Sequence, residues 1–340
     1  MRKLNVLIAG STGYIGVQLV KLLNKHQNIN IKYLCGNSSV GKNISYYDKD
    51  LRNNKLPKIV KFNKSYLNNV DIVFTALPNG EAQLLSKHLL PKNRLIDLAA
   101  DFRLHDHKEY KKWYKIDHKA KNNIPNSIYA LPEVSKKYLK NYKIIACPGC
   151  YPTSILLPLL PLLRKNIISE KNIIIDSKSG YSGAGRLVHK KYANKNLYES
   201  LSAYEIGFHR HNSEIEQEIS KVCKKKFQFS FTPHLTPMFK GLLSTIYINV
   251  PKKMNAKRIY NSLKKVYKNN FFIKFAKFNK AISTNDVINT NNCLISVCKS
   301  KYKDKIIILS AIDNLIKGGS GQGVQNMNVI YNFPESRGLI

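Results

Sequence analysis

A cysteine at a predicted strand-to-helix turn is the residue whose position most clearly suggests chemistry. Cys150 follows a buried strand predicted over 142–146, and the apolar stretch 153–164 predicts a helix after it. The unpaired N–H groups and the dipole at a helix N-terminus favour an anion and therefore stabilise a thiolate. Because a thiolate is a good nucleophile, the sequence predicts covalent catalysis by Cys150.

A glycine turn near the start of the chain predicts nucleotide binding. Residues 4–9 are an apolar strand, and a helix is expected over 14–24. The first glycine between them allows a tight turn, the second lets the backbone approach a pyrophosphate, and the third lets the helix pack against the strand. The spacing is G-x-x-G-x-x-G, and the predicted cofactor-binding turn is Gly10, Ser11, Thr12, Gly13, Tyr14, Ile15 and Gly16.

The segment after the second predicted strand favours NADP over NAD. An acidic residue about 20 residues beyond the glycines usually binds the ribose hydroxyls of NAD. Residues 35–42 contain no acid, whereas Ser38 and Lys42 offer a hydroxyl and an ammonium group for the extra phosphate of NADP. Together with Cys150, this indicates an enzyme that holds an acyl group on sulfur while a nicotinamide supplies hydride.

The order of predicted elements indicates two α/β domains. Strands alternate with helices over the first part, which predicts a Rossmann-like, doubly wound parallel sheet in 1–149, completed by a C-terminal helix within about 315–340. Residues 150–314 predict an α+β domain with a mixed or antiparallel sheet, for catalysis, substrate binding and oligomerisation. The strands expected are 4–9, 29–35, 70–76, 94–99, 144–147, 173–177, 227–232, 243–250, 271–275, 292–297 and 306–312, and the further helices are 213–222, 256–268 and 321–331.

The composition is strongly basic, with 56 Lys and Arg residues against 21 Asp and Glu residues and a formal net charge of +35. Such a charge could mean nucleic-acid binding, but the lysines are scattered and Asn and Ile are abundant with them. No apolar run approaches the roughly 20 residues that span a bilayer. The six cysteines predict neither a disulfide framework nor a metal site, and we expect a cytoplasmic protein.

Ordered motifs along nearly the whole chain give a resemblance. They lie at 10–16, 76–80, 96–104, 129–133, 148–153, 176–186, 209–215, 313–318 and 321–328. In this order and spacing they resemble the N-acetyl-gamma-glutamyl-phosphate reductase family of arginine biosynthesis, which is related in architecture to aspartate-semialdehyde dehydrogenase. The resemblance implies NADPH-dependent reduction of an acyl phosphate, N-acetyl-L-glutamyl 5-phosphate, to the 5-semialdehyde through a thioester on Cys150.

The resemblance also implies roles for further residues. His211 is the first choice for the acid/base and His209 the second, and Glu214 could orient the imidazole of His211. Guanidinium and ammonium groups bind carboxylate and phosphoryl oxygens. The predicted substrate-binding residues are Arg103, Arg186, Arg210, Lys240, Ser179 and Ser182, and the predicted C-terminal cofactor contacts are Asn314 and Gly318.

Some positions depart from the family pattern. Cys147 stands where Asn is usual, Asn79 where His is usual, and Asn37 where an arginine is common. Lys240 replaces an Arg, which keeps the charge but loses the bidentate fork. If Cys147 reaches Cys150, oxidation would form a disulfide and stop catalysis reversibly.

Other interpretations stay open from sequence alone. A reductase of N-acetyl-aminoadipyl phosphate, one methylene longer, is not separated by the motifs. The C-x-x-C spacing of Cys147 and Cys150 also suits a thiol oxidoreductase, although the glycine turn would then be unexplained. The resemblance suggests a homodimer or homotetramer without a specific nucleic-acid or membrane partner.

Overall fold

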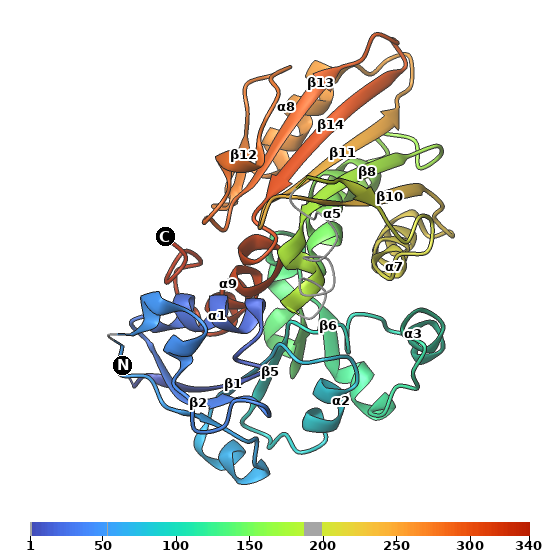
Figure 1. The fold of residues 1–340 in the computed structure, drawn as a ribbon. Helices are drawn as coiled ribbons and strands as arrows, with labels where there is room; N and C mark the ends of the chain where they lie inside the picture. Colours follow the sequence, from blue (N-terminus) through green and yellow to red (C-terminus); the bar gives the residue numbers. More distant parts are fainter. Residues whose placement is uncertain (1, 53, 187–198) are drawn as a thin grey trace. The chain divides into compact units, whose positions relative to one another are not determined.

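The computed structural model describes residues 2–52, 54–186 and 199–340. The chain divides into two compact units (Figure 1), Met1–Pro148 with Gly319–Ile340, and Gly149–Gly318. Each unit contains one seven-stranded sheet, here called sheet A and sheet B.

Sheet A is parallel throughout, as predicted, and its strand order is β3-β2-β1-β4-β5-β7-β6. The central strands are nearly continuous apolar runs because a parallel sheet is covered on both faces. β1 and β4 are therefore buried along most of their lengths. The strands are β1 (Leu4–Ala9), β2 (Ile29–Cys35), β3 (Ile59–Val60), β4 (Ile72–Thr75), β5 (Arg94–Asp97), β6 (Ser127–Tyr129) and β7 (Ile144–Ala146).

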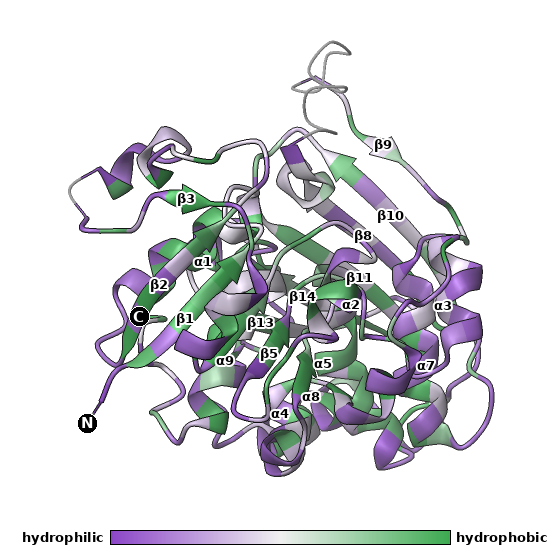
Figure 2. Ribbon diagram, turned by 90° about the horizontal axis from the view of Figure 1, so that it is seen from below, coloured by the Kyte–Doolittle hydropathy of each residue, from purple (hydrophilic) through white to green (hydrophobic). Residues whose placement is uncertain are grey.

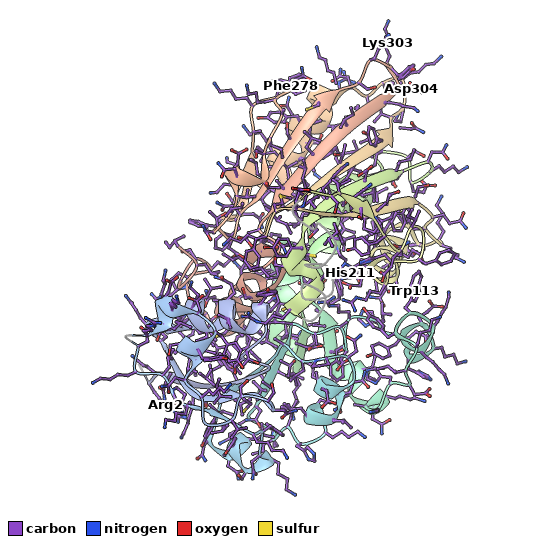
Figure 3. All side chains as sticks on the ribbon, in the orientation of Figure 1. Arg2, Trp113, His211, Phe278, Lys303 and Asp304 are labelled. Atoms are coloured by element: carbon purple, nitrogen blue, oxygen red, sulfur yellow. The ribbon has the colours of Figure 1, made fainter. Side chains whose placement is uncertain are left out.

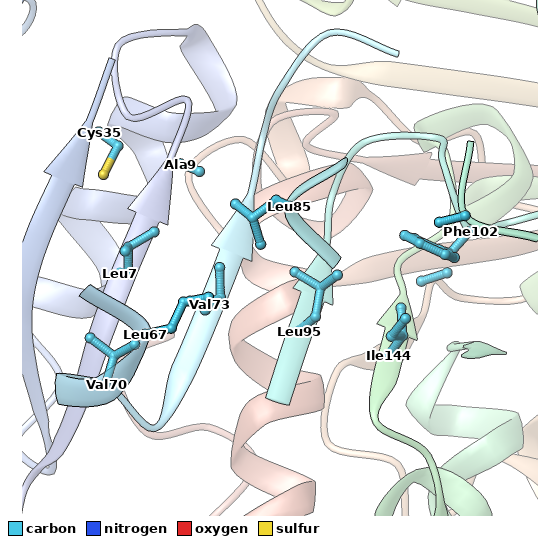
Figure 4. Close-up of a cluster of buried hydrophobic side chains, with 12 residues drawn as sticks. Leu7, Ala9, Cys35, Leu67, Val70, Val73, Leu85, Leu95, Phe102 and Ile144 are labelled. Carbon is cyan, nitrogen blue, oxygen red and sulfur yellow. The ribbon is translucent and has the colours of Figure 1, made fainter. Parts of the chain in front are cut away.

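The two faces of sheet A are covered by different segments. α1 (Tyr14–Asn24) and the C-terminal α9 (Gly321–Ile330) pack together and contact β1 and β5, respectively. The opposite face carries a core cluster that includes Leu7, Val73, Leu95 and Phe102 (Figure 4). The strands are correspondingly hydrophobic in Figure 2.

An excursion of the chain, residues 98–126 between β5 and β6, contains the short helix α3 (His107–Tyr114). Its outer side is hydrophilic (Figure 2), and Asp106 caps its first turn through a hydrogen bond from the backbone N–H of Lys108. Tyr110 and Tyr114 stack on its inner side, with ring centroids 4.6 Å apart. This pair anchors the excursion in a small cluster with Leu104 and Ala100.

Sheet B is mixed, with the strand order β12-β13-β14-β11-β8-β10-β9. The pairs β12–β13 and β8–β10 are parallel and the others antiparallel, as the α+β prediction allowed. The strands are β8 (Ile174–Gly180), β9 (Ser202–Ala203), β10 (Ser230–Thr236), β11 (Leu242–Asn249), β12 (Ile273–Phe275), β13 (Cys293–Lys299) and β14 (Lys305–Ile312).

One face of sheet B is covered by helices. α5 (Cys150–Arg164) contacts β11 and β14, α8 (Ala256–Val266) contacts β13, and α7 (His211–Cys223) packs on α5 (Figure 1). On the covered side, the hydroxyl of Ser244 lies 2.7 Å from those of Ser154 and Ser177. The other face alternates half-buried and exposed side chains, including Ile174 and Tyr247.

Several predicted boundaries in this unit were wrong. The strand predicted over 173–177 runs to Gly180, and the strand predicted over 271–275 is only Ile273–Phe275. The strand predicted over 227–232 runs instead from Ser230 to Thr236, because Phe227 is buried in the preceding loop, where its N–H donates to the Ser220 hydroxyl. The helix predicted from Ser213 begins at His211. Among the residues described, no helix is long and apolar enough to cross a membrane.

Candidate active site

Cys150 is the first residue of α5, directly after Gly149, the helix N-cap. The predicted strand-to-helix turn is thereby confirmed, since β7 ends at Ala146. The side chain of Thr153 donates to the Gly149 carbonyl at 2.9 Å, and so does its backbone N–H. Cys150 is half-buried, so its sulfur sits at the positive end of a fixed helical turn.

Gly149 has no side chain because the His211 ring occupies that space. A Cβ at Gly149 would lie 2.4 Å from His211 Nε2 and 2.6 Å from its Cε1. The backbone of Gly149 is not in the left-handed region, so the reason for glycine here is close approach. The imidazole of His211 (labelled in Figure 3) therefore lies directly against the residue that precedes the nucleophile.

Glu214 joins these two parts of the site. Its Oε2 accepts a hydrogen bond from the Gly149 N–H at 2.9 Å, and its Oε1 lies 3.8 Å from His211 Nε2. Its side chain is fully buried, whereas that of His211 is 9% exposed. The carboxylate faces the imidazole at 3.8 Å, so Glu214 is placed to orient the His211 ring.

His209 lies behind His211 in an aromatic cluster. Its Nδ1 accepts the backbone N–H of His211 at 3.0 Å, which places the ring proton on Nε2, 3.4 Å from the Tyr204 hydroxyl. Burial, followed by the charge of Arg210, lowers the pKa of His209 to about 3. A ring that stays neutral at working pH suits a role in holding His211 better than one as the acid/base.

Tyr151 and Tyr204 complete this cluster and were not singled out from the sequence. The Tyr151 ring centroid is 5.4 Å from that of His209 and 5.8 Å from that of His211. Its hydroxyl donates to the His234 carbonyl and lies 3.2 Å from the Tyr204 hydroxyl. The positions of Gly149 and Tyr151 on either side of Cys150 were an available signal, whereas nothing local marked Tyr204.

The predicted substrate loop at the end of β8 is pinned by Asn314. The Asn314 side chain donates to the Ser182 hydroxyl at 3.0 Å and accepts the Gly241 N–H at 2.7 Å. Both ends of the amide are therefore engaged within the protein. Ser179 is buried, and its hydroxyl lies 3.2 Å from the Gly180 carbonyl.

Lys240 and Gly318 also lie in the Gly149–Gly318 unit. Lys240 Nζ donates to the Asn289 side chain and lies 3.8 Å from a carboxylate oxygen of Asp313. A Cβ at Gly318 would lie 2.7 Å from that of Cys150, so Gly318 touches the nucleophile.

The three predicted substrate-binding arginines are placed differently. Arg103 belongs to the other unit, is 7% exposed, and donates to the carbonyls of Cys147 and Leu98 at 2.8 and 3.2 Å. Arg210 is exposed and Arg186 is half-buried. The structure thus ties Arg103 to backbone, and the substrate roles of all three stay predictions.

The glycine turn has the shape that a bound pyrophosphate requires. A Cβ at Gly10, whose φ is +84°, would lie 2.3 Å from the Ala76 carbonyl oxygen. A Cβ at Gly16 would lie 2.1 Å from the Gly10 carbonyl oxygen. At Gly13, the N-cap of α1, a Cβ would meet its nearest atom only at 3.9 Å. The backbone is therefore closely packed at Gly10 and Gly16, and it is open at Gly13, the helix N-terminus, where an anion can bind.

The remaining predicted cofactor residues lie in the turn after β1 and the first turn of α1, or, for Ser38 and Lys42, after the carboxyl end of β2. Ser11 is buried and donates to the Cys35 carbonyl at 3.1 Å, which ties the turn to β2. Thr12, Tyr14 and Ile15 are half-buried, whereas Ser38 and Lys42 are exposed. Lys42 Nζ lies 4.3 Å from the centre of the Tyr46 ring.

Cys147 differs sharply from Cys150 in environment. It is fully buried, its sulfur accepts from the Asn326 side chain at 3.5 Å, and burial raises the pKa of its thiol to about 12. All six cysteines are free. Such a thiol attacks a disulfide slowly, and the proposed disulfide with Cys150 stays a prediction.

Comparison with known proteins identifies the family. The family model for the semialdehyde dehydrogenase NAD binding domain matches residues 5–142, and that for the dimerisation domain matches 150–314. N-acetyl-gamma-glutamyl-phosphate reductase of Thermoanaerobacter pseudethanolicus is 42% identical over 337 residues, which cover 98% of this chain and 96% of that protein. The chain belongs to the N-acetyl-gamma-glutamyl-phosphate reductase family.

Other similar proteins agree with this membership. The reductase of Clostridium novyi is 40% identical over 99% of this chain and 98% of its own. A probable chloroplastic reductase of Arabidopsis thaliana is 38% identical over 100% of this chain and 84% of its own. The resemblance drawn from the motifs is thereby confirmed.

Solved structures show that this reductase shares the fold of aspartate semialdehyde dehydrogenases. The Vibrio cholerae enzyme II aligns with a TM-score of 0.72 at 17% identity and covers 98% of this chain and 99% of its own. The Candida albicans enzyme, solved with NADP, aligns at 0.69 and 16% identity, covering 97% and 98%. The predicted two-domain α/β architecture is thereby confirmed.

The contact between Gly149 and His211 gives a first prediction. We expect Gly149→Ala to lower kcat/KM by roughly 100-fold, since misplacing a reacting group by about 1 Å can cost that much. The measurement is steady-state reduction of the acyl phosphate, with circular dichroism to verify folding.

A double variant controls for nonspecific damage. In His211→Ala the ring is gone, so adding Gly149→Ala should cost nothing further. A full additional loss in the double variant would contradict the contact.

The neutral state of His209 gives a second prediction. The unfolded ring takes a proton near pH 6.5 and the folded ring only near pH 3. The unfolded state therefore binds more protons between these values, and stability falls as pH falls through this window. We expect the urea midpoint to drop less between pH 6.5 and 4.5 in His209→Gln than in the wild type, with exposed His88→Gln as the control. Equal slopes in all three proteins would contradict the assignment.

Proposed function

We propose that this protein reduces N-acetyl-L-glutamyl 5-phosphate to N-acetyl-L-glutamate 5-semialdehyde and phosphate, with NADPH as reductant, in arginine biosynthesis. The observation that carries the proposal is the arrangement of Cys150, His211 and Glu214 around Gly149. It occurs in a chain whose full length matches reductases of this name. An acyl phosphate suits this nucleophile because phosphate is a good leaving group.

The chain's own residues would carry the covalent steps. His211 Nε2 takes the proton from the Cys150 thiol, and the sulfur attacks the acyl carbon. A C–S bond forms, the C–O bond to phosphate breaks, and the thioester remains on Cys150. When bound, NADPH would supply the hydride that reduces the thioester carbon. As the C–S bond breaks, the aldehyde forms and the sulfur leaves as a thiolate, which takes back the proton held on His211, while the released phosphate takes its proton from solvent.

Charged and hydroxyl groups near this centre are proposed to hold the substrate. Arg186, Arg210 and Lys240 would pair with carboxylate and phosphoryl oxygens, and Ser179 and Ser182 would line the loop that receives them. Arg103 and Asn314 would also hold neighbouring segments in place, Arg103 through the Cys147 and Leu98 carbonyls and Asn314 through the Gly241 N–H and the Ser182 hydroxyl. Gly318 would leave room beside the sulfur.

The nucleotide is proposed to bind on the unit formed by Met1–Pro148 and Gly319–Ile340. Its pyrophosphate would meet the N–H groups at the start of α1, in the space left open at Gly13. Ser38 and Lys42 would meet the additional phosphate of NADP.

The protein is further proposed to be a homodimer in the cytoplasm. The helix-free face of sheet B would meet the same face of a second copy, in agreement with the dimerisation-domain match over 150–314. The side chains of Thr245 and Leu309 lie opposite each other at its centre. Six free cysteines suit a reducing compartment.

The reverse reaction tests the proposed activity. We expect phosphate-dependent reduction of NADP with N-acetyl-L-glutamate 5-semialdehyde in the wild type and none in Cys150→Ala. Absorbance at the nicotinamide band measures it. An inactive, folded and reduced wild type would contradict the proposal, and activity only with the substrate one methylene longer would reassign it to N-acetyl-aminoadipyl phosphate.

The dimer has its own test. Light scattering should give about twice the 38.9 kDa chain mass, and Thr245→Arg should shift the protein toward the monomer by placing two like charges in the interface. Asn269→Arg, on an exposed turn after α8, is the control. A monomeric wild type at micromolar concentration would refute the interface, whereas a mass four times that of the chain would indicate a homotetramer.

A further inference from the structure

Two buried carboxylates follow β5 and take no part in the proposed chemistry. Asp97 ends β5, and Asp101 lies in the loop after it. Both side chains are fully buried. A buried carboxylate is costly unless hydrogen-bond donors surround it, so the donors around each one show what it holds.

Asp97 holds the end of β4. Its Oδ1 accepts the Thr75 hydroxyl at 2.6 Å and the Ala99 N–H at 3.0 Å. Its Oδ2 lies 3.3 Å from the Phe102 N–H. Thr75 is the last residue of β4, so Asp97 fixes the point at which the following loop, Ala76–Gly80, leaves the sheet.

Asp101 holds the other end of that loop. Its Oδ1 accepts the Gly80 N–H at 2.7 Å, and its Oδ2 lies 3.2 Å from the N–H of Gln83. These are the N-cap and third residues of α2 (Glu81–Ser86), whose cap glycine has a φ of +91° and no side chain of its own. Asp101 thus supplies, from 21 residues away, the capping carboxylate that α2 lacks.

The loop between these two attachments lies beside the nucleotide turn. β1 and β4 are neighbouring parallel strands, and the chain leaves them toward opposite sides of sheet A. Ligands of open α/β sheets bind at this switch point, outside the carboxyl ends of the strands. The Ala76 carbonyl oxygen lies 2.3 Å from where a Gly10 Cβ would be, so loop Ala76–Gly80 borders the glycine turn, where this rule places the crevice that receives the nucleotide.

The excursion after β5 supports Asp101 in turn. The Tyr110 hydroxyl donates to Asp101 Oδ1 at 2.7 Å, and His118 Nε2 lies 2.8 Å from the Asp101 carbonyl oxygen. Leu85 of α2 and Phe102 of the Asp101 loop both enter the same core cluster of sheet A (Figure 4). Both α2 and the loop that carries Asp101 are therefore anchored in the hydrophobic core of sheet A.

We propose that Asp97 and Asp101 are positioning residues that clamp both ends of loop Ala76–Gly80, and that this clamp sets the affinity of the protein for NADPH. The inference rests on the proposed function only in that NADPH binds at this crevice. It assigns to the excursion, through Tyr110 and His118, a role in cofactor binding that the motifs did not suggest.

The most informative variant is Asp101→Asn. An amide can replace only one carboxylate oxygen as an acceptor, so its NH₂ group would face the Gly80 or the Gln83 N–H. We expect the Kd for NADPH, measured by fluorescence titration, to rise about tenfold or more, because a displaced loop loses contacts with the nucleotide and each loss of about 1.4 kcal/mol of binding free energy is a factor of ten. The KM for NADPH should rise in parallel, while kcat at saturating NADPH and the KM for the acyl phosphate stay within twofold.

Matched variants separate positioning from general damage. Tyr110→Phe removes one donor to Asp101 and should raise the Kd by a smaller factor; it also provides the test should Asp101→Asn fail to fold. Glu109→Gln also replaces a carboxylate by an amide, as Asp101→Asn does, but on an exposed residue of α3, the helix that contains Tyr110. It should leave the Kd for NADPH unchanged.

Each outcome decides a separate question. An unchanged Kd in folded Asp101→Asn, or in Tyr110→Phe if the former does not fold, would overturn the clamp, even if thermal stability fell. A fall in kcat with an unchanged KM for NADPH would overturn it as well. A wild type that does not bind NADPH would instead refute the proposed function.

Discussion

The catalytic unit depends on one buried carboxylate, that of Glu214. It accepts the N–H of Gly149 with one oxygen and faces the His211 ring with the other. The N–H belongs to the N-cap of the helix that begins with Cys150, and the ring belongs to the helix that begins with His211. A single side chain therefore fixes the distance between the nucleophile and the proposed acid/base, and the absence of a Cβ at Gly149 lets that distance be short.

His209 fixes the backbone of His211 by accepting its N–H. Because its Nδ1 accepts the His211 N–H, its tautomer is fixed, and its burial keeps it neutral. The two histidines flanking Arg210 are thus placed differently: the proposed acid/base, His211, faces Glu214, and His209 holds the backbone from which His211 projects.

The sequence predicted what depends on short segments. Cys150 at a strand-to-helix turn, the glycine turn and the parallel sheet follow from local patterns of apolar and glycine residues, and the structure has them at those positions. The contact of His211 with Gly149 spans 62 residues and depends on tertiary packing that no local pattern encodes. The strand wrongly begun at Phe227 shows the converse error, because an aromatic residue favours strands yet here is buried in a loop.

The few buried acidic residues of this basic chain hold backbone segments near its two proposed binding and catalytic regions. Among the residues described, the buried ones are Asp97, Asp101, Glu214 and Asp313. All four accept backbone N–H groups, and Asp313 does so from Leu315, Ile316 and Asn289. Each thus fixes a loop near the glycine turn or near Cys150. A carboxylate can accept several N–H groups at once, an ability that the abundant lysines lack. An excess of lysine on the surface can therefore accumulate without disturbing the site, as long as these few interior acceptors remain.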